Sequence, residues 1–134
     1  MPKRILVVDD IKDWQLTLSG MLTDEGYEVV TVGSRQAALA AVEVNQFDLA
    51  VIDIRLDEVD EGNTAGLDLA GEVKSIVTGL PVIIITGYEM PDMIDRAMKP
   101  DEHGQTLAID FVRKTEANEL VDIVNKTLHS SNKE

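Results

Sequence analysis

The chain of 134 residues contains no cysteine, and only 4% of its residues are aromatic. The absence of cysteine excludes disulfide bonds, thiolate metal sites and cysteine nucleophiles. Because aromatic residues are so few, a hydrophobic core has to be built mainly from Val, Ile, Leu and Ala. Hydrophobic residues make up 44% of the chain, which is enough for one folded domain of ordinary size.

Positive charge is scarce as well, since 12 Lys and Arg residues stand against 25 Asp and Glu residues, for a formal net charge of −13. The basic residues are scattered, which argues against a nucleic-acid-binding surface and against binding to an anionic membrane. No apolar run is long enough to span a bilayer, and no signal peptide precedes the first apolar run. We therefore expect a cytoplasmic protein.

Short apolar runs alternate with segments of helical periodicity. The runs predict strands at 3–9, 27–32, 48–53, 80–86 and 107–112, and the periodic segments predict helices at 11–25, 36–44, 67–77, 88–98 and 116–128. Asp10, Ser34 and Thr115 are candidate N-caps, and Gly26 is a candidate helix stop. Strict alternation with short connections predicts a three-layer α/β domain around a parallel sheet.

Polar residues with functional potential stand where these strands end. Asp9 and Asp10 follow the first strand, Asp53 ends the third, Thr86 ends the fourth, and Lys114 follows the fifth. In a parallel sheet the carboxyl ends of the strands line one crevice, so these side chains should converge. Three neighbouring carboxylates repel one another, and the arrangement is favourable only with a cation between them.

Each of these residues also has a structural interpretation. Taken alone, Asp10 suggests a helix cap, Thr86 a strand end, Lys114 a solvated lysine and Phe111 a core residue, while Asp53 is equally typical of a turn and of a site. The coincidence of positions favours a site. The glycine-rich fingerprints of dinucleotide-binding and phosphate-binding loops are missing, so nucleotide binding by either route is not expected.

Four motifs carry a resemblance to a known family: Val7-Val8-Asp9-Asp10, Asp53, Thr86-Gly87 and Phe111-Val112-Arg113-Lys114. Together they resemble the CheY-like receiver domain of two-component response regulators, over essentially the whole chain. The resemblance implies a flavodoxin-like α/β fold, in which a doubly wound five-stranded parallel sheet with strand order 2-1-3-4-5 is flanked by five helices. We expect the receiver domain at 1–129 and a disordered polar tail at 130–134.

The resemblance also implies roles for individual residues. Asp9, Asp10 and Asp53, together with the backbone carbonyl of Arg55, would bind Mg²⁺. Asp53 would be the phosphoacceptor. Among the remaining site residues, Thr86 would donate a hydrogen bond to the phosphoryl group and Lys114 would contact it as a cation. Phe111 would change rotamer with the phosphorylation state.

The expected function is that of a conformational switch in a phosphorelay, with no enzymatic activity beyond its own phosphorylation and dephosphorylation. The partners would be a sensor histidine kinase or phosphotransfer protein and an output protein, and a homodimer is compatible with the sequence. The alternative is a receiver-like module that binds proteins without phosphorylation. A Mg²⁺-dependent phosphohydrolase is less favoured, because Arg55 stands where such enzymes commonly carry a second acid.

The sequence departs from the family pattern in three places. Residues 56–65 form an inserted loop after Asp53, and residues 99–106 form an extra loop, which suggests a partner of its own or a changed mode of dimerisation. Thr115 replaces a proline that normally follows a cis bond. A cis bond before a non-proline residue costs about 3–4 kcal/mol, so we expect a trans Lys114–Thr115 bond. Arg55→Ala is expected to change the rate of dephosphorylation.

Overall fold

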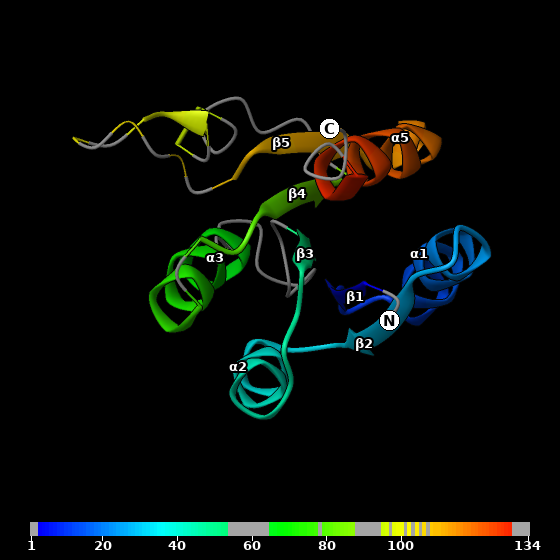
Figure 1. The fold of residues 1–134 in the computed structure, drawn as a ribbon, viewed down its shortest axis with the longest axis horizontal. Coiled ribbons are helices and arrows are strands. Elements are labelled where there is room, and N and C mark those ends of the chain that lie inside the picture. Colours follow the sequence, from blue (N-terminus) through cyan, green and yellow to red (C-terminus); the bar gives the residue numbers. More distant parts are fainter. Residues whose placement is uncertain are drawn as a thin grey trace.

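The computed structural model describes residues 3–53, 65–77, 79–87, 95–96, 98–100 and 108–129, together with residues 102, 104 and 106. Five parallel strands form one sheet in the order β2-β1-β3-β4-β5, as predicted (Figure 1). The elements are β1 (Arg4–Val8), α1 (Lys12–Asp24), β2 (Glu28–Val32), α2 (Arg35–Val44), β3 (Leu49–Asp53), α3 (Ala65–Ile76), β4 (Val82–Thr86), β5 (Asp110–Arg113), a 3₁₀ turn (Lys114–Glu116) and α5 (Asn118–His129).

Helices cover both faces of the sheet. Figure 1 shows α1 and α5 on one side and α2 and α3 on the other. Successive strand residues point to opposite faces, and β1 divides accordingly: Ile5 and Val7 pack with α1 and α5, whereas Leu6 and Val8 pack with α2 and α3. Every residue of β3 and β4 is buried. Burial on both faces is the reason that these strands are continuous apolar runs rather than alternating ones.

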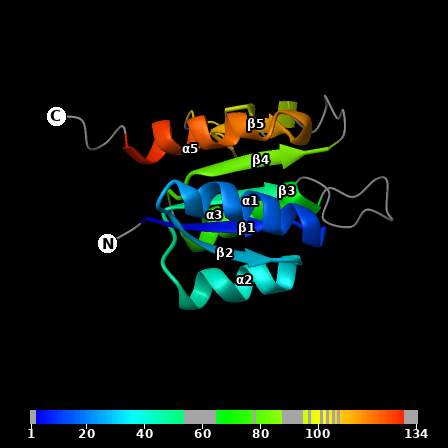
Figure 2. The ribbon, with the colours of Figure 1, turned by 90° about the vertical axis from the view of Figure 1, so that its right-hand side faces the viewer.

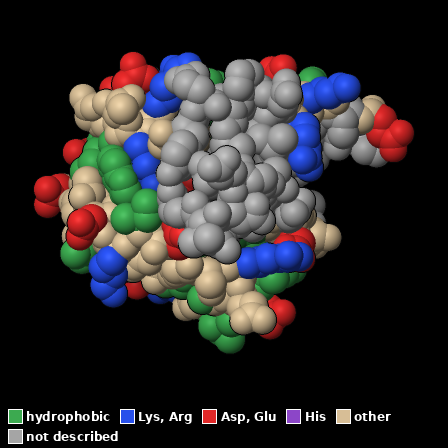
Figure 3. Space-filling view, turned by 180° about the vertical axis from the view of Figure 1, so that it is seen from behind, with side chains coloured by type: hydrophobic (Ala, Val, Ile, Leu, Met, Phe, Trp, Pro, Cys, Tyr) green, Lys and Arg blue, Asp and Glu red, His purple; other side chains and the backbone are tan. Residues whose placement is uncertain are grey.

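The strands point the same way, so their carboxyl ends share one edge of the domain (Figure 2). Figure 3 views the molecule from that side, and the described basic and acidic side chains there are interspersed. Among the described residues, no helix has the length and apolar character that a membrane crossing requires.

The helix caps and the helix stop predicted in the first half of the chain were confirmed in part. Ser34 caps α2 as predicted, since its Oγ accepts a hydrogen bond from the Ala37 N–H at 3.1 Å. Gly26 ends the α1 region with a φ of 95°, which glycine adopts without strain. The prediction of Asp10 as the cap of α1 was wrong, because Ile11 occupies the cap position. The Ile11 N–H instead donates to Asp9 Oδ1 at 2.9 Å.

The C-terminal third differs more from the prediction. β5 begins at Asp110 rather than at 107, and a 3₁₀ turn precedes α5, so Thr115 is not the cap of that helix. The Lys114–Thr115 bond is trans, as expected, since the described residues contain no cis peptide bond. Of the helix predicted at 88–98, only Asp95, Arg96 and Met98 are described, and all three are helical.

Three predicted segments lie wholly or partly outside the described residues. These are the inserted loop at 56–65, of which only Ala65 is described, the loop at 99–106 and the tail at 130–134. Ala65 is the first residue of α3, so this helix begins two residues earlier than predicted.

Candidate functional site

Strand register brings the predicted site residues to one place. Val8 pairs with Ile52, and Asp9 and Asp53 are the next residue along each of these strands. On the other side of β3, Asp53 pairs with Ile85, so Thr86 lies one step beyond that pair. Thr86 in turn pairs with Arg113, the residue that precedes Lys114. The ends of β1, β3, β4 and β5 therefore lie side by side at one edge of the sheet.

These residues are buried although they are polar. Among the described residues, Asp9, Asp53, Thr86 and Lys114 are the buried polar or charged ones, and their exposure is between 0% and 8%. Charged side chains are almost never fully buried unless they are paired. The concentration of all four at the carboxyl edge of the sheet indicates a site rather than an accident of packing.

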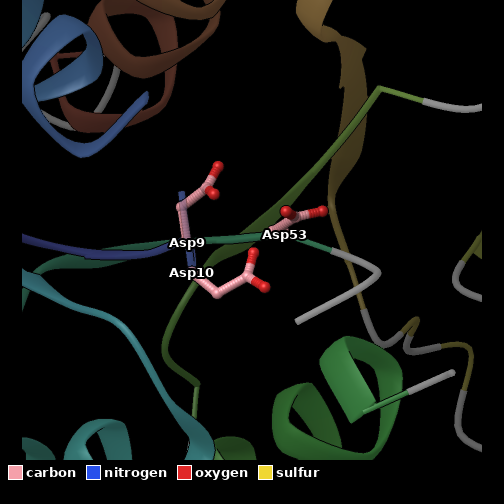
Figure 4. Close-up of side chains that lie close together, drawn as sticks. All are labelled: Asp9, Asp10 and Asp53. Atoms are coloured by element: carbon pink, nitrogen blue, oxygen red, sulfur yellow. The ribbon is translucent and has the colours of Figure 1, made fainter. Parts of the chain in front are cut away.

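Asp9, Asp10 and Asp53 form the acidic part of the site (Figure 4). One carboxylate oxygen from each lies within 4.8 Å of the others. An octahedral Mg²⁺ with ligands about 2.1 Å away has opposite ligand oxygens roughly 4.2 Å apart. A small inward movement of the carboxylates would therefore complete three ligand positions for a hard cation. Oxygen donors of this kind suit a metal such as Mg²⁺ and not a soft one.

Lys114 supplies positive charge to the same cluster. Its Nζ lies 2.9 Å from Asp9 Oδ2 and donates to Asp53 Oδ2 at 3.2 Å. Burial alone would lower the pKa of Lys114, but the charge of Asp53, together with the hydrogen bonds and charge of Asp9, outweighs burial and raises the pKa. The ammonium therefore stays charged. Three carboxylates and one ammonium leave two negative charges, which one divalent cation would neutralise.

The start of α1 fixes the orientation of Asp9. Its Oδ1 accepts the Ile11 N–H at 2.9 Å, and its backbone carbonyl accepts a hydrogen bond from Gln15 Nε2 at 2.7 Å. The Asp9 N–H donates to the Val32 carbonyl at 3.1 Å, which extends the pairing with β2 beyond the strand. Asp9 thus presents Oδ2 to Lys114 from a fixed backbone.

Thr86 ends β4, Gly87 follows it, and Phe111 lies on the neighbouring strand β5. Thr86 is buried at the end of β4. A methyl group at Gly87 would lie 3.4 Å from Lys114 Cδ, so glycine leaves the lysine stem its full space. Phe111, on β5, is partly buried against the cluster under α2 and α3, and the Arg113 guanidinium carbon lies 5.8 Å from its ring centroid. Arg55, the predicted backbone ligand, lies outside the described residues.

Two neighbours of the site were not predicted to have functional roles. The centroid of the Trp14 ring lies 5.1 Å from Lys114 Nζ. Gln15, the next residue, holds the Asp9 carbonyl. Both residues follow Asp10 closely and lie in the first turn of α1. Their position in the sequence could therefore have indicated that they lie near the site. The contact between Trp14 and Lys114 joins residues 100 positions apart and requires the folded sheet.

Comparisons with known proteins agree with this geometry. The family described as "Response regulator receiver domain" matches residues 5–125. The transcriptional regulatory protein GlrR of Escherichia coli is 36% identical over 94 residues, which cover 69% of this chain and 20% of GlrR. The chain therefore spans about a fifth of the length of that relative.

Solved structures give the same result. A CheY-like response regulator receiver domain protein from Methanospirillum hungatei has a TM-score of 0.81 at 26% identity, with 98% of each chain covered. The receiver domain of NtrX from Brucella abortus has a TM-score of 0.78 at 32% identity, with 93% of this chain and 98% of that chain covered. The fold and family expected from the sequence are confirmed, and the chain belongs to the response-regulator receiver family.

Proposed function

We propose that Asp53 accepts a phosphoryl group and that the chain thereby acts as a conformational switch in a phosphorelay. The observation that carries the proposal is the contact of the Lys114 ammonium with Asp53 inside a buried cluster of three carboxylates. A lysine that receives an anionic group at Asp53 would need to lie there.

The chemistry follows from the charges. One carboxylate oxygen of Asp53 attacks the phosphorus atom of the donor, a phosphorus–oxygen bond forms, and the bond to the donor's leaving group breaks with its electrons going to that group. Mg²⁺, held by Asp9, Asp10, Asp53 and the backbone carbonyl of Arg55, would offset the repulsion between carboxylate and phosphoryl group. Lys114 adds a second positive charge as a compact point charge.

Thr86 and Phe111 are proposed to transmit the change. The Thr86 hydroxyl, at the end of the strand next to β3, would donate a hydrogen bond to the new phosphoryl oxygens. If Thr86 moved inward, it would vacate volume that Phe111, a partly buried residue of the neighbouring strand, could fill. The hydrogen bond from Thr86 to the phosphoryl group would thus shift the balance between two conformations of the surface around Phe111.

The partners are proposed on chemical grounds. A phosphorylated histidine of a sensor kinase or phosphotransfer protein would donate the group, and an output protein or domain would read the altered surface. GlrR is described as a transcriptional regulatory protein, so a receiver of this kind can serve regulation of transcription. No substrate turnover is proposed beyond the gain and loss of the chain's own phosphoryl group.

The test is the intact mass of the protein after incubation with acetyl phosphate and Mg²⁺. The protein should gain one phosphoryl group, and neither Asp53→Asn nor the metal-free sample should gain it. Asp122→Asn is the matched control, since Asp122 is an exposed aspartate on α5, and it should be phosphorylated like the unaltered protein.

No gain of mass in folded, Mg²⁺-binding protein would instead favour a binding module that works without phosphorylation. The contact of Lys114 with both Asp9 and Asp53 is compatible with that alternative, because the ammonium partly neutralises the cluster by itself.

A further inference from the structure

The ring of Trp14 lies beside the ammonium of Lys114. The Lys114 Nζ lies 5.1 Å from the centroid of the Trp14 ring, and the same atom contacts Asp9 and Asp53. The ammonium therefore lies between the carboxylates of Asp9 and Asp53 and the ring of Trp14, a residue of α1. Trp14 is the chain's one tryptophan.

The contact has the geometry of a cation–π interaction. A cation within about 6 Å of an indole centroid is attracted by the negative face of the ring, and the attraction grows when water is excluded. Lys114 is 8% exposed, so little water competes. The lysine stem has four flexible carbons, and an adjacent ring limits where its ammonium can go.

Trp14 is itself held in place by the start of α1. Its N–H donates to the Ile11 carbonyl at 3.0 Å, and the Ile11 N–H donates to Asp9 Oδ1 at 2.9 Å. Its ring also packs against the cluster that α1 shares with α5. Asp9, Trp14 and Lys114 thus form one unit, in which the helix start positions both a carboxylate and a ring around the same ammonium.

We propose that Trp14 is a positioning residue for phosphoryl transfer, whose ring holds the Lys114 ammonium at Asp53. The inference rests on the proposed phosphoryl-acceptor function. Without the ring, the ammonium would spend part of its time away from Asp53, and the stabilisation of charge on the transferring group would fall accordingly.

The first test compares phosphorylation rates from acetyl phosphate at saturating Mg²⁺, measured by intact mass. Trp14→Leu keeps an apolar side chain but removes the ring, and should lower the rate roughly 2- to 30-fold, the equivalent of about 0.5–2 kcal/mol of cation–π attraction. Trp14→Phe keeps a ring and should restore most of the rate. Met21→Ala is the matched control, since Met21 is a partly buried residue of α1 in the same cluster, and it should leave the rate unchanged.

The second test observes the contact directly. Protons on Lys114 Cε should show an upfield ring-current shift in the NMR spectrum, and Trp14→Leu should abolish it while Met21→Ala should not. The NMR measurement needs no phosphoryl donor. A substitution that only loosens the packing of the cluster, such as Met21→Ala, would leave the Lys114 Cε shift in place.

The two proposals fail in different ways. Equal rates for the unaltered protein and Trp14→Leu, or a Lys114 Cε shift that is insensitive to Trp14→Leu, would overturn the positioning role and leave phosphorylation of Asp53 intact. An unaltered protein that never gains a phosphoryl group would overturn the proposed function and, with it, the role of Trp14 in transfer.

Discussion

The Nζ of Lys114 lies 2.9 Å from Asp9 Oδ2, so the residue after the last strand is joined to the residue after the first. Lys114→Met should destabilise the protein by about 3 kcal/mol in the absence of divalent cations, because removing one partner of a buried ion pair leaves an uncompensated charge. Here the three carboxylates of the cluster would remain without their ammonium. Urea unfolding in the presence of a chelator measures the difference.

Lys126→Met is the matched control for this variant. Lys126 is exposed on α5, and a surface substitution away from special features changes stability by about 0.5 kcal/mol or less. Equal effects of the two substitutions would show that Lys114 does not compensate the cluster.

Divalent cation binding should stabilise the unaltered protein. At a free Mg²⁺ concentration a hundred times the dissociation constant, the gain would be about 2.7 kcal/mol for one site that exists only in the folded state. Asp10→Asn should weaken the binding, since it replaces one of three clustered carboxylates by a neutral amide and so removes a negative charge from the site. The measurement is the melting temperature with Mg²⁺ and with NaCl at matched ionic strength, and identical values in both salts would argue against a cation site.

Most of the fold could be predicted because burial and strand pairing coincide in β1, β3 and β4. Near β5, burial and strand pairing no longer begin at the same residue. Ala108 is buried, but the regular ladder begins only at the pair of Asp110 with Ile83, after the backbone bond from Ile109 N–H to the Val82 carbonyl. The apolar run therefore predicts a longer strand than the hydrogen bonds form.

The site could be predicted only to the level of strand ends. Asp9, Asp53 and Lys114 converge because parallel strands share an edge. At the start of α1, Ile11 rather than Asp10 occupies the cap position, and the Ile11 N–H donates to Asp9 Oδ1. The ring of Trp14 approaches Lys114, a residue 100 positions further along the chain. Both contacts depend on how α1 packs on the folded sheet, which local sequence patterns do not specify.

Ser34 should contribute to stability as the cap of α2. Its Oγ accepts the Ala37 N–H at 3.1 Å, and Ser34→Ala removes this acceptor, which typically costs about 1 kcal/mol. Ser34→Asn should restore the loss, because an asparagine side chain can accept the same bond. The capping role is tested by the free energy of unfolding of the unaltered protein and of the two variants. A Ser34→Asn protein that is no more stable than Ser34→Ala would contradict that role.

Tyr27 should make stability depend on pH in the alkaline range. Its hydroxyl donates to Asn125 Oδ1 at 2.5 Å, and burial, with a smaller contribution from the charge of Glu25, raises the pKa of Tyr27 above the ordinary 10.0. The folded state thus favours the neutral phenol. This contribution to stability is complete below the ordinary pKa and is lost as the pH rises through the raised one.

Tyr27→Phe isolates this contribution, since it removes the ionisable hydroxyl and retains the ring. The free energy of unfolding of the unaltered protein relative to Tyr27→Phe should be constant near neutral pH, should begin to fall as the pH passes the ordinary 10.0 and should level off above the raised pKa of Tyr27. Other groups that titrate in this range cancel in the comparison. The chain has two tyrosines, so a tyrosinate absorbance titration of the variant reports Tyr88 alone, and the difference from the unaltered protein reports Tyr27. A Tyr27 that ionises at or below 10.0 would mean that burial and Glu25 do not stabilise its neutral form.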